Sequence, residues 1–179
     1  YFIIIKLINT EKRWGIKLKK EIFSDVNELW KIISTPGHLE KIHPYCKSNY
    51  TIKWSGKNSI DILIYLNGMR YVREFKSWNP KKGFSLVIGE ENKEKSYVEW
   101  EISNANNKTY LAITVYPYFM KNYNKLISLL PYQIFIKPNL IKYLNNVIDG
   151  INWHIKNKVK VPNNNFGKHK WFSDEKRVF

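Results

Sequence analysis

Two histidines stand close together in a short segment bounded by a glycine and a proline, GHLEKIHP (37–44). Because an imidazole titrates near neutral pH, either side chain could serve as an acid or a base, and His43 is the candidate catalytic residue. Ordinary surface histidines are the competing interpretation. A metal site that included His154 would call for a tight spacing such as HxxxH, which the sequence lacks, so no metal site is predicted.

Arg73 and Glu74 are adjacent in the alternating segment YVREFKSW (71–78). Successive side chains of a strand point to opposite faces, so one of the two should face the inside of the sheet. A buried charge needs a partner or a ligand, and Arg73 could meet a ligand carboxylate or enolate as a second catalytic candidate. The alternatives are an outward Arg73 paired across strands, or an inward Glu74.

Aromatic residues in the expected strands are candidate ligand contacts. Trp100 stands between two glutamates in YVEWEIS (97–103), so its ring should point inward, as core or as pocket wall. Tyr65, Tyr110 and Tyr116 could bring hydroxyl groups into an apolar cavity, where each would need a hydrogen-bond partner. Tyr71, beside Arg73, is a further candidate ligand contact. Tyrosines at the edge of a sheet are the competing interpretation.

Gly150 lies inside a segment with strong helical periodicity, where glycine costs about 1 kcal/mol relative to alanine. At helical spacing it follows Tyr143 and Val147 and precedes His154, so all four are expected on one flank. The missing side chain would leave room for a ligand or for a close strand. A tolerated, exposed glycine is the alternative.

These residues are distributed over a clear order of elements. Residues 13–23 alternate like a strand, Ser24 is a suitable N-cap, and the helix that it opens ends at Pro36-Gly37, before a second short helix. Six strands with short polar turns follow, including SIDILIYL (59–66), whose apolar face we assign to Ile60, Ile62, Ile64 and Leu66. Residues 138–158 then form a long amphipathic helix, whose stripe contains Leu140, Leu144, Val147, Ile148, Ile151 and Ile155.

This order resembles the START-like, or Bet v 1-like, helix-grip superfamily, which includes polyketide cyclase-like proteins. The residues that carry the resemblance are IFSDVNELWKIISTPGHLEKIHP, SWNPKKGF and PNLIKYLNNVIDGINWHI. It implies an α+β fold with a seven-stranded curved antiparallel sheet around a long C-terminal helix, and two short helices after the first strand that close one end of a cavity. A single domain is expected over residues 1–158. The tail, 159–179, holds several aromatic residues and is expected to pack on that domain.

The resemblance implies binding of a hydrophobic small molecule or lipid in the internal cavity, without a cofactor. One alternative is an enzyme of the polyketide cyclase or dehydratase type in the same cavity, with His43 or Arg73 acting together with a tyrosine. The single cysteine, Cys46, lies in no sequence motif that would activate its thiol as a nucleophile, and it is interpreted as structural.

The formal net charge of +15 raises the question of polyanionic partners. Only four of the 30 basic residues are arginines, and the lysines are spread along the chain, so nucleic acid is not the expected partner and a solvated basic surface is the simplest interpretation. A further alternative is a peripheral module on an anionic membrane, with 118–138 as the contact. No segment is long and apolar enough to span a bilayer, and the expected location is cytoplasmic.

Overall fold

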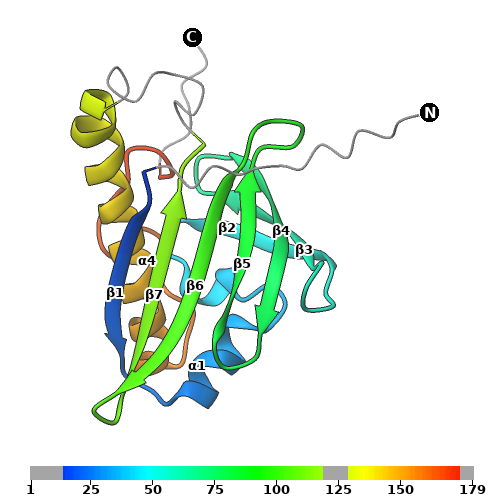
Figure 1. Ribbon diagram of the computed structural model, residues 1–179, viewed down its shortest axis with the longest axis vertical. Coiled ribbons are helices and arrows are strands. Elements are labelled where there is room, and N and C mark those ends of the chain that lie inside the picture. The colour runs from blue at the N-terminus through cyan, green and yellow to red at the C-terminus, as the bar shows by residue number, and fades with distance from the viewer. Residues whose placement is uncertain (1–13, 119–128, 174–179) are drawn as a thin grey trace.

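The computed structural model describes residues 14–118 and 129–173. Seven antiparallel strands form one curved sheet in the order β1-β7-β6-β5-β4-β3-β2 (Figure 1). The strands are β1 (Ile16–Ile22), β2 (Cys46–Lys53), β3 (Ile60–Tyr65), β4 (Arg70–Asn79), β5 (Gly83–Gly89), β6 (Ser96–Ala105) and β7 (Lys108–Tyr116). The predicted meander is therefore confirmed, and β1 closes the sheet by pairing with the last strand rather than with the second.

Two short helices connect β1 to β2, as the sequence predicts. They are α1 (Val26–Ile33) and α2 (Leu39–Ile42), and α1 lies across one end of the sheet (Figure 1). The N-cap of α1 is Asp25 and not the expected Ser24, because the Asp25 carboxylate accepts a hydrogen bond from the backbone N–H of Glu28 at 2.8 Å. Gly37, at a φ of 69°, supplies the left-handed conformation that separates the helices.

The long C-terminal helix, α4 (Lys137–Asn157), packs on β1 and α2 and buries the whole predicted stripe. Residues 129–131 are already helical, and a π-helical turn, η1 (Tyr132–Ile136), joins them to α4. The helical segment thus begins before the predicted start at Pro138. A wider turn is one way in which a helix accommodates the hydrogen bond that a proline cannot donate.

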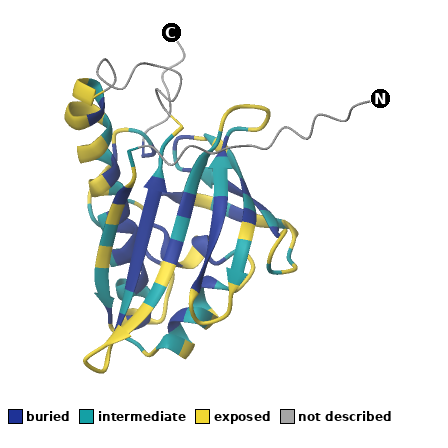
Figure 2. Cartoon of the chain, viewed as in Figure 1, coloured by how far each residue is buried: buried dark blue, intermediate teal, exposed yellow. Residues whose placement is uncertain are grey.

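The isoleucines of β3 share one face, as the alternation predicts, but this is not the concave face of the sheet. The side chains of β3 that reach the sheet's concave side are Asp61, Leu63 and Tyr65, whereas Ile62 is buried outside the main hydrophobic core. Both faces of this strand carry apolar side chains, so alternation alone does not identify the inner one. Figure 2 shows that burial is greatest along the middle of the sheet and that the hairpin ends are exposed.

The chain after α4 runs back along the short helices. Lys158 adopts a left-handed conformation at the helix end, and the backbone N–H groups of Val161 and Asn164 then donate to the carbonyls of Lys41 and Pro44 at 2.9 Å. Further on, His169 and Phe172 are buried. None of the described helices has the length and apolar character that crossing a membrane requires.

Candidate functional site

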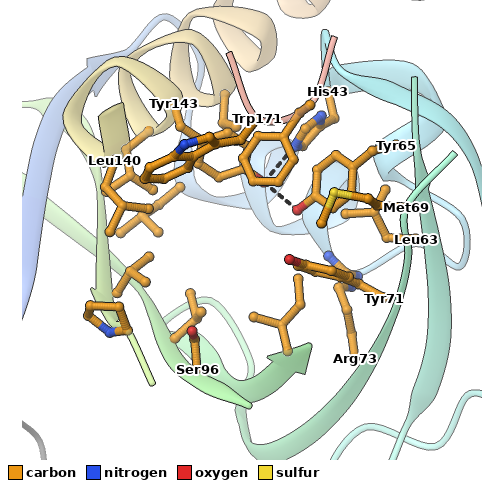
Figure 3. A pocket seen from close by; sticks show the side chains of 18 of the residues that line it. His43, Leu63, Tyr65, Met69, Tyr71, Arg73, Ser96, Leu140, Tyr143 and Trp171 are labelled. Carbon is orange, nitrogen blue, oxygen red and sulfur yellow. Dashed lines mark hydrogen bonds between the residues drawn. The ribbon is translucent and has the colours of Figure 1, made fainter. Parts of the chain in front are cut away.

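A cavity of about 610 Å³ lies between the concave face of the sheet and α4. Its walls come from the short helix α2, from strands β3 to β7, from η1 and α4, and from the chain after α4, and most of the side chains are apolar (Figure 3). A volume of this size is typical of sites that bind small molecules. The cavity is therefore the candidate ligand site.

Most of the residues predicted from the sequence meet in this cavity. Those that line it are His43, Tyr65, Tyr71, Arg73, Trp100, Tyr143 and Val147. Tyr116, Gly150 and His154 do not line it, and for these three the structure corrects the expectation of a ligand contact.

The three exceptions each have another environment. A Cβ atom on Gly150 would collide with the backbone carbonyl oxygen of Ile42, so the glycine lets α2 approach α4 closely and leaves no space for a ligand. The ring of Tyr116 lies against Gly15. The ring nitrogen Nδ1 of His154 lies 2.7 Å from the carbonyl oxygen of Val159, at the end of its own helix.

Arg73 is the inward member of the adjacent pair, and it is ion-paired within the fold. Its Nε and Nη2 atoms donate to the two carboxylate oxygens of Asp61 on β3, each at 2.7 Å. Both side chains are almost completely buried, with 3% of Arg73 and none of Asp61 exposed. Glu74 points to the other face, where Lys76 and Lys95 pair with it. The sequence suggested a cross-strand partner for Arg73 only if its side chain pointed outward, whereas the pair lies on the inner face of the sheet.

His43 is buried at the inner end of the cavity and is not a surface residue. Its Nδ1 accepts a hydrogen bond from the backbone N–H of Tyr45 at 3.1 Å, and its Nε2 lies 2.8 Å from the hydroxyl of Tyr143. That hydroxyl lies 3.0 Å from the hydroxyl of Tyr65 (Figure 3). Burial, with a smaller contribution from the charge of Arg73, lowers the pKa of His43 to about 3, so the ring is neutral at physiological pH.

The second histidine, His38, is also buried but lies outside the cavity lining. Its Nδ1 lies 2.9 Å from the carbonyl oxygen of Thr35, so it donates there, while Nε2 has no partner among the described residues. Burial and the nearby Arg73 lower its pKa to about 3 as well. Burial raises the pKa of the Cys46 thiol to about 12, which fits the structural role expected for it.

The chain after α4 contributes residues that the sequence did not assign to the site. Phe172 stacks on Tyr65 with ring centroids 4.2 Å apart, and Lys170 and Trp171 also line the cavity. Asn67, in the β3–β4 turn, donates from its side chain to the carbonyl of Trp171 at 2.6 Å and from its backbone to that of Phe172 at 3.2 Å. The aromatic residues of the tail predict that it packs on the domain, but they do not predict which surface it contacts.

Comparison with solved structures identifies the fold. A START superfamily protein from Mycobacterium smegmatis matches with a TM-score of 0.61 and 9% identity, over 81% of this chain and 99% of that one. Ara h 8.0201 matches with a TM-score of 0.60 and 10% identity, over 79% and 97% of the two chains. The major latex-like protein 151 of Panax ginseng matches with a TM-score of 0.58 and 12% identity, over 78% and 95%. The chain therefore has the helix-grip fold of the START and Bet v 1-like proteins, as expected.

A protein from the dynemicin biosynthetic locus, DynU16, has the same fold, with a TM-score of 0.58 and 9% identity over 82% of this chain and 48% of that one. No protein-family model matches the sequence, and no match is found among curated proteins. At these identities the likeness concerns the fold, so the function has to be argued from the cavity itself.

Proposed function

We propose that this helix-grip domain binds a hydrophobic small molecule or lipid in the cavity between its sheet and α4. The observation that carries the proposal is the cavity itself, about 610 Å³ in volume and walled mainly by apolar side chains from both layers of the fold. Transfer of an apolar ligand from water into such a space is favourable in proportion to the apolar area that is buried.

Narrowing the cavity from both sides should weaken binding of an apolar fluorescent probe. Val98 on β6 and Val147 on α4 both line it, so Val98→Phe combined with Val147→Phe fills space from the sheet and from the helix. We expect the probe affinity to fall by about tenfold or more, since each 1.4 kcal/mol of lost contact is tenfold. The measurement is a fluorescence titration, with thermal melts to show that the variant is folded.

Val87→Phe is the matched control, because Val87 lies on the neighbouring strand β5 but outside the cavity lining. Its probe affinity should equal that of the parent. Unchanged probe affinity in the folded double variant would contradict the proposal. Denaturing mass spectrometry of the purified chain for co-purified small molecules is the direct route to the natural ligand.

Catalysis of the cyclase or dehydratase type in the same cavity is the alternative, and the geometry around His43 makes it the weaker one. The Nδ1 lone pair already accepts from the Tyr45 backbone, and Nε2 carries the hydrogen that faces Tyr143. A ring with a pKa near 3 is a poor general base at neutral pH, because proton transfer is most effective when the pKa lies close to the working pH.

A second candidate function is contact with an anionic membrane surface. Leu130, Ile134 and Phe135 are 66%, 54% and 59% exposed on η1 and the turn before it, next to the cavity residues Ile136 and Leu140. Part of the membrane segment expected from the sequence, 119–128, lies outside the described residues. An exposed apolar row on a chain of net charge +15 fits an interfacial contact, which would place the cavity beside the lipid.

Removing that row should reduce binding to vesicles. We expect Leu130→Ser with Phe135→Ser to lower the affinity for phosphatidylserine-containing vesicles by about tenfold or more in a co-sedimentation assay, because two apolar side chains no longer enter the interface. Val159→Ser is the control, since Val159 is also exposed (57%) but follows the opposite end of α4. Parent protein that fails to sediment with anionic vesicles even at low salt would contradict this candidate.

A further inference from the structure

The hydrogen bonds that join His43, Tyr143 and Tyr65 at the inner end of the cavity begin at a contact whose donor is known. A backbone N–H always donates, so Nδ1 of His43, 3.1 Å from the N–H of Tyr45, must be the acceptor. The neutral ring then carries its single hydrogen on Nε2. That hydrogen points to the Tyr143 hydroxyl oxygen 2.8 Å away, so His43 donates to Tyr143.

The three side chains hold one more donor hydrogen than they use. His43, Tyr143 and Tyr65 supply one N–H and two O–H hydrogens, whereas only two contacts join them, at 2.8 and 3.0 Å. Burial raises the pKa of both tyrosines, so both hydroxyls keep their protons. The 3.0 Å contact between the hydroxyls allows either one to donate, and we take the direction in which Tyr143, polarised by the hydrogen bond from His43, donates to Tyr65, so that the hydrogen of Tyr65 is left over. Both tyrosines line the cavity, where this hydrogen can meet a ligand (Figure 3).

Two of the acceptor groups on the same wall, those of Asp61 and Asn67, are already engaged. Both carboxylate oxygens of Asp61 accept from Arg73, and the side-chain oxygen of Asn67 accepts from the backbone N–H of Met69 at 3.1 Å. Formal charge on this wall also cancels, because Arg73 and Asp61 form a pair and His43 is neutral. The solvent-exposed Lys170, which the tail contributes, is a cation in high dielectric and compensates little for a buried anion.

We infer that the ligand of this cavity carries a neutral carbonyl oxygen, as in a ketone, an ester or a quinone, and that this oxygen accepts the unused hydrogen of Tyr65. The inference rests on the proposed binding function and specifies its ligand class. A pure hydrocarbon leaves the donor unpaired. A carboxylate would be buried against a wall that has donors but no net positive charge, and an alcohol would bring a hydrogen of its own that needs an acceptor, although Asp61 and Asn67 already accept from Arg73 and Met69.

A matched series of naphthalenes tests the inference on the whole chain. The probes are 2-acetylnaphthalene, 2-ethylnaphthalene, 1-(2-naphthyl)ethanol and 2-naphthoate, which differ in the polar group and share the apolar body. We expect the ketone to bind about three- to tenfold more tightly than the ethyl compound at neutral pH, as one net hydrogen bond predicts, and the alcohol and carboxylate to bind more weakly than the ketone. Isothermal titration calorimetry gives the four dissociation constants.

Two phenylalanine variants locate the donor. In Tyr65→Phe the ketone-to-ethyl ratio should fall towards one with the ethyl affinity unchanged, because the donated hydrogen is gone and the Tyr143 hydroxyl lies 3.0 Å from the position of the lost oxygen. Tyr71→Phe is the matched comparison, since it removes another hydroxyl that lines the cavity but takes no part in the His43–Tyr143–Tyr65 hydrogen bonds. Its ratio should stay as in the parent.

The possible results distinguish a failure of this inference from a failure of the proposed binding function. Equal affinities for ketone and ethyl compound in the parent would overturn this inference and leave the proposed function standing, and that result does not depend on any variant folding. Tightest binding of 2-naphthoate would overturn the neutral ligand class, and a loss of the ratio in Tyr71→Phe would overturn the donor assignment. If none of the four compounds binds, the proposed function fails and this inference fails with it.

Discussion

Replacing Arg73 by methionine is expected to lower the free energy of unfolding by about 3–5 kcal/mol, because the change leaves the Asp61 carboxylate buried without its partner. Asp61 has no exposed surface and both of its oxygens accept from Arg73, so water cannot take over the lost hydrogen bonds without opening the cavity wall. A loss of this size is a large part of the stability of an ordinary domain, which is about 5–15 kcal/mol. Urea unfolding followed by circular dichroism gives the difference.

The double variant Asp61→Leu with Arg73→Met separates two quantities. One is the net contribution of the ion pair to the free energy of unfolding, and the other is the cost of leaving one buried charge without its partner. Because two buried charges are removed together, the double variant should recover most of the stability, and a buried ion pair replaced by apolar residues is often neutral or stabilising. Lys76→Met, at an exposed pair on the outer face of the same strand, should cost about 1 kcal/mol or less. A single Arg73→Met variant as stable as Lys76→Met would show that Asp61 is not confined as the structure has it.

The element order could be predicted from the sequence because each signal is local. Pro36-Gly37 and the 3.6-residue stripe from Leu140 to Ile155 act within a few residues, and both lie where expected in the fold. Local sequence patterns also predicted several of the residues that line the cavity. Trp100 lies between two glutamates, and Tyr143 and Val147 lie on one flank of the helix, so all three point inward for reasons that are visible in the sequence.

The remaining features depend on contacts between distant parts of the chain. Gly150 serves the close approach of α2, more than a hundred residues earlier, and no local pattern distinguishes that use from a ligand cavity. The direction of the His43–Tyr143–Tyr65 network depends on a backbone N–H two residues after the histidine. Likewise, the contacts of Phe172 with Tyr65 and of Asn67 with the tail join segments whose spacing in the sequence carries no information about their meeting.

Lowering the pH from about 7 to about 5 is expected to reduce the free energy of unfolding by about 2 kcal/mol for each of His38 and His43. Both have a folded-state pKa near 3 against an ordinary value of 6.5, so the unfolded chain takes up protons first as the pH falls. Stability is therefore complete above the ordinary value and is lost progressively towards pH 3. The buried His169, whose pKa burial also lowers, changes stability in the same direction.

Urea unfolding at a series of pH values measures this loss, and a glutamine variant assigns it. Glutamine at position 43 can still accept from a backbone N–H and donate to a hydroxyl, but it does not titrate, so His43→Gln should be less stable near pH 7 and yet lose about 1.4 kcal/mol less per pH unit below pH 6. The same slope in His43→Gln as in the parent would mean that His43 reaches water in the folded state, and the fixed tautomer from which the donor at Tyr65 is derived would then be lost as well.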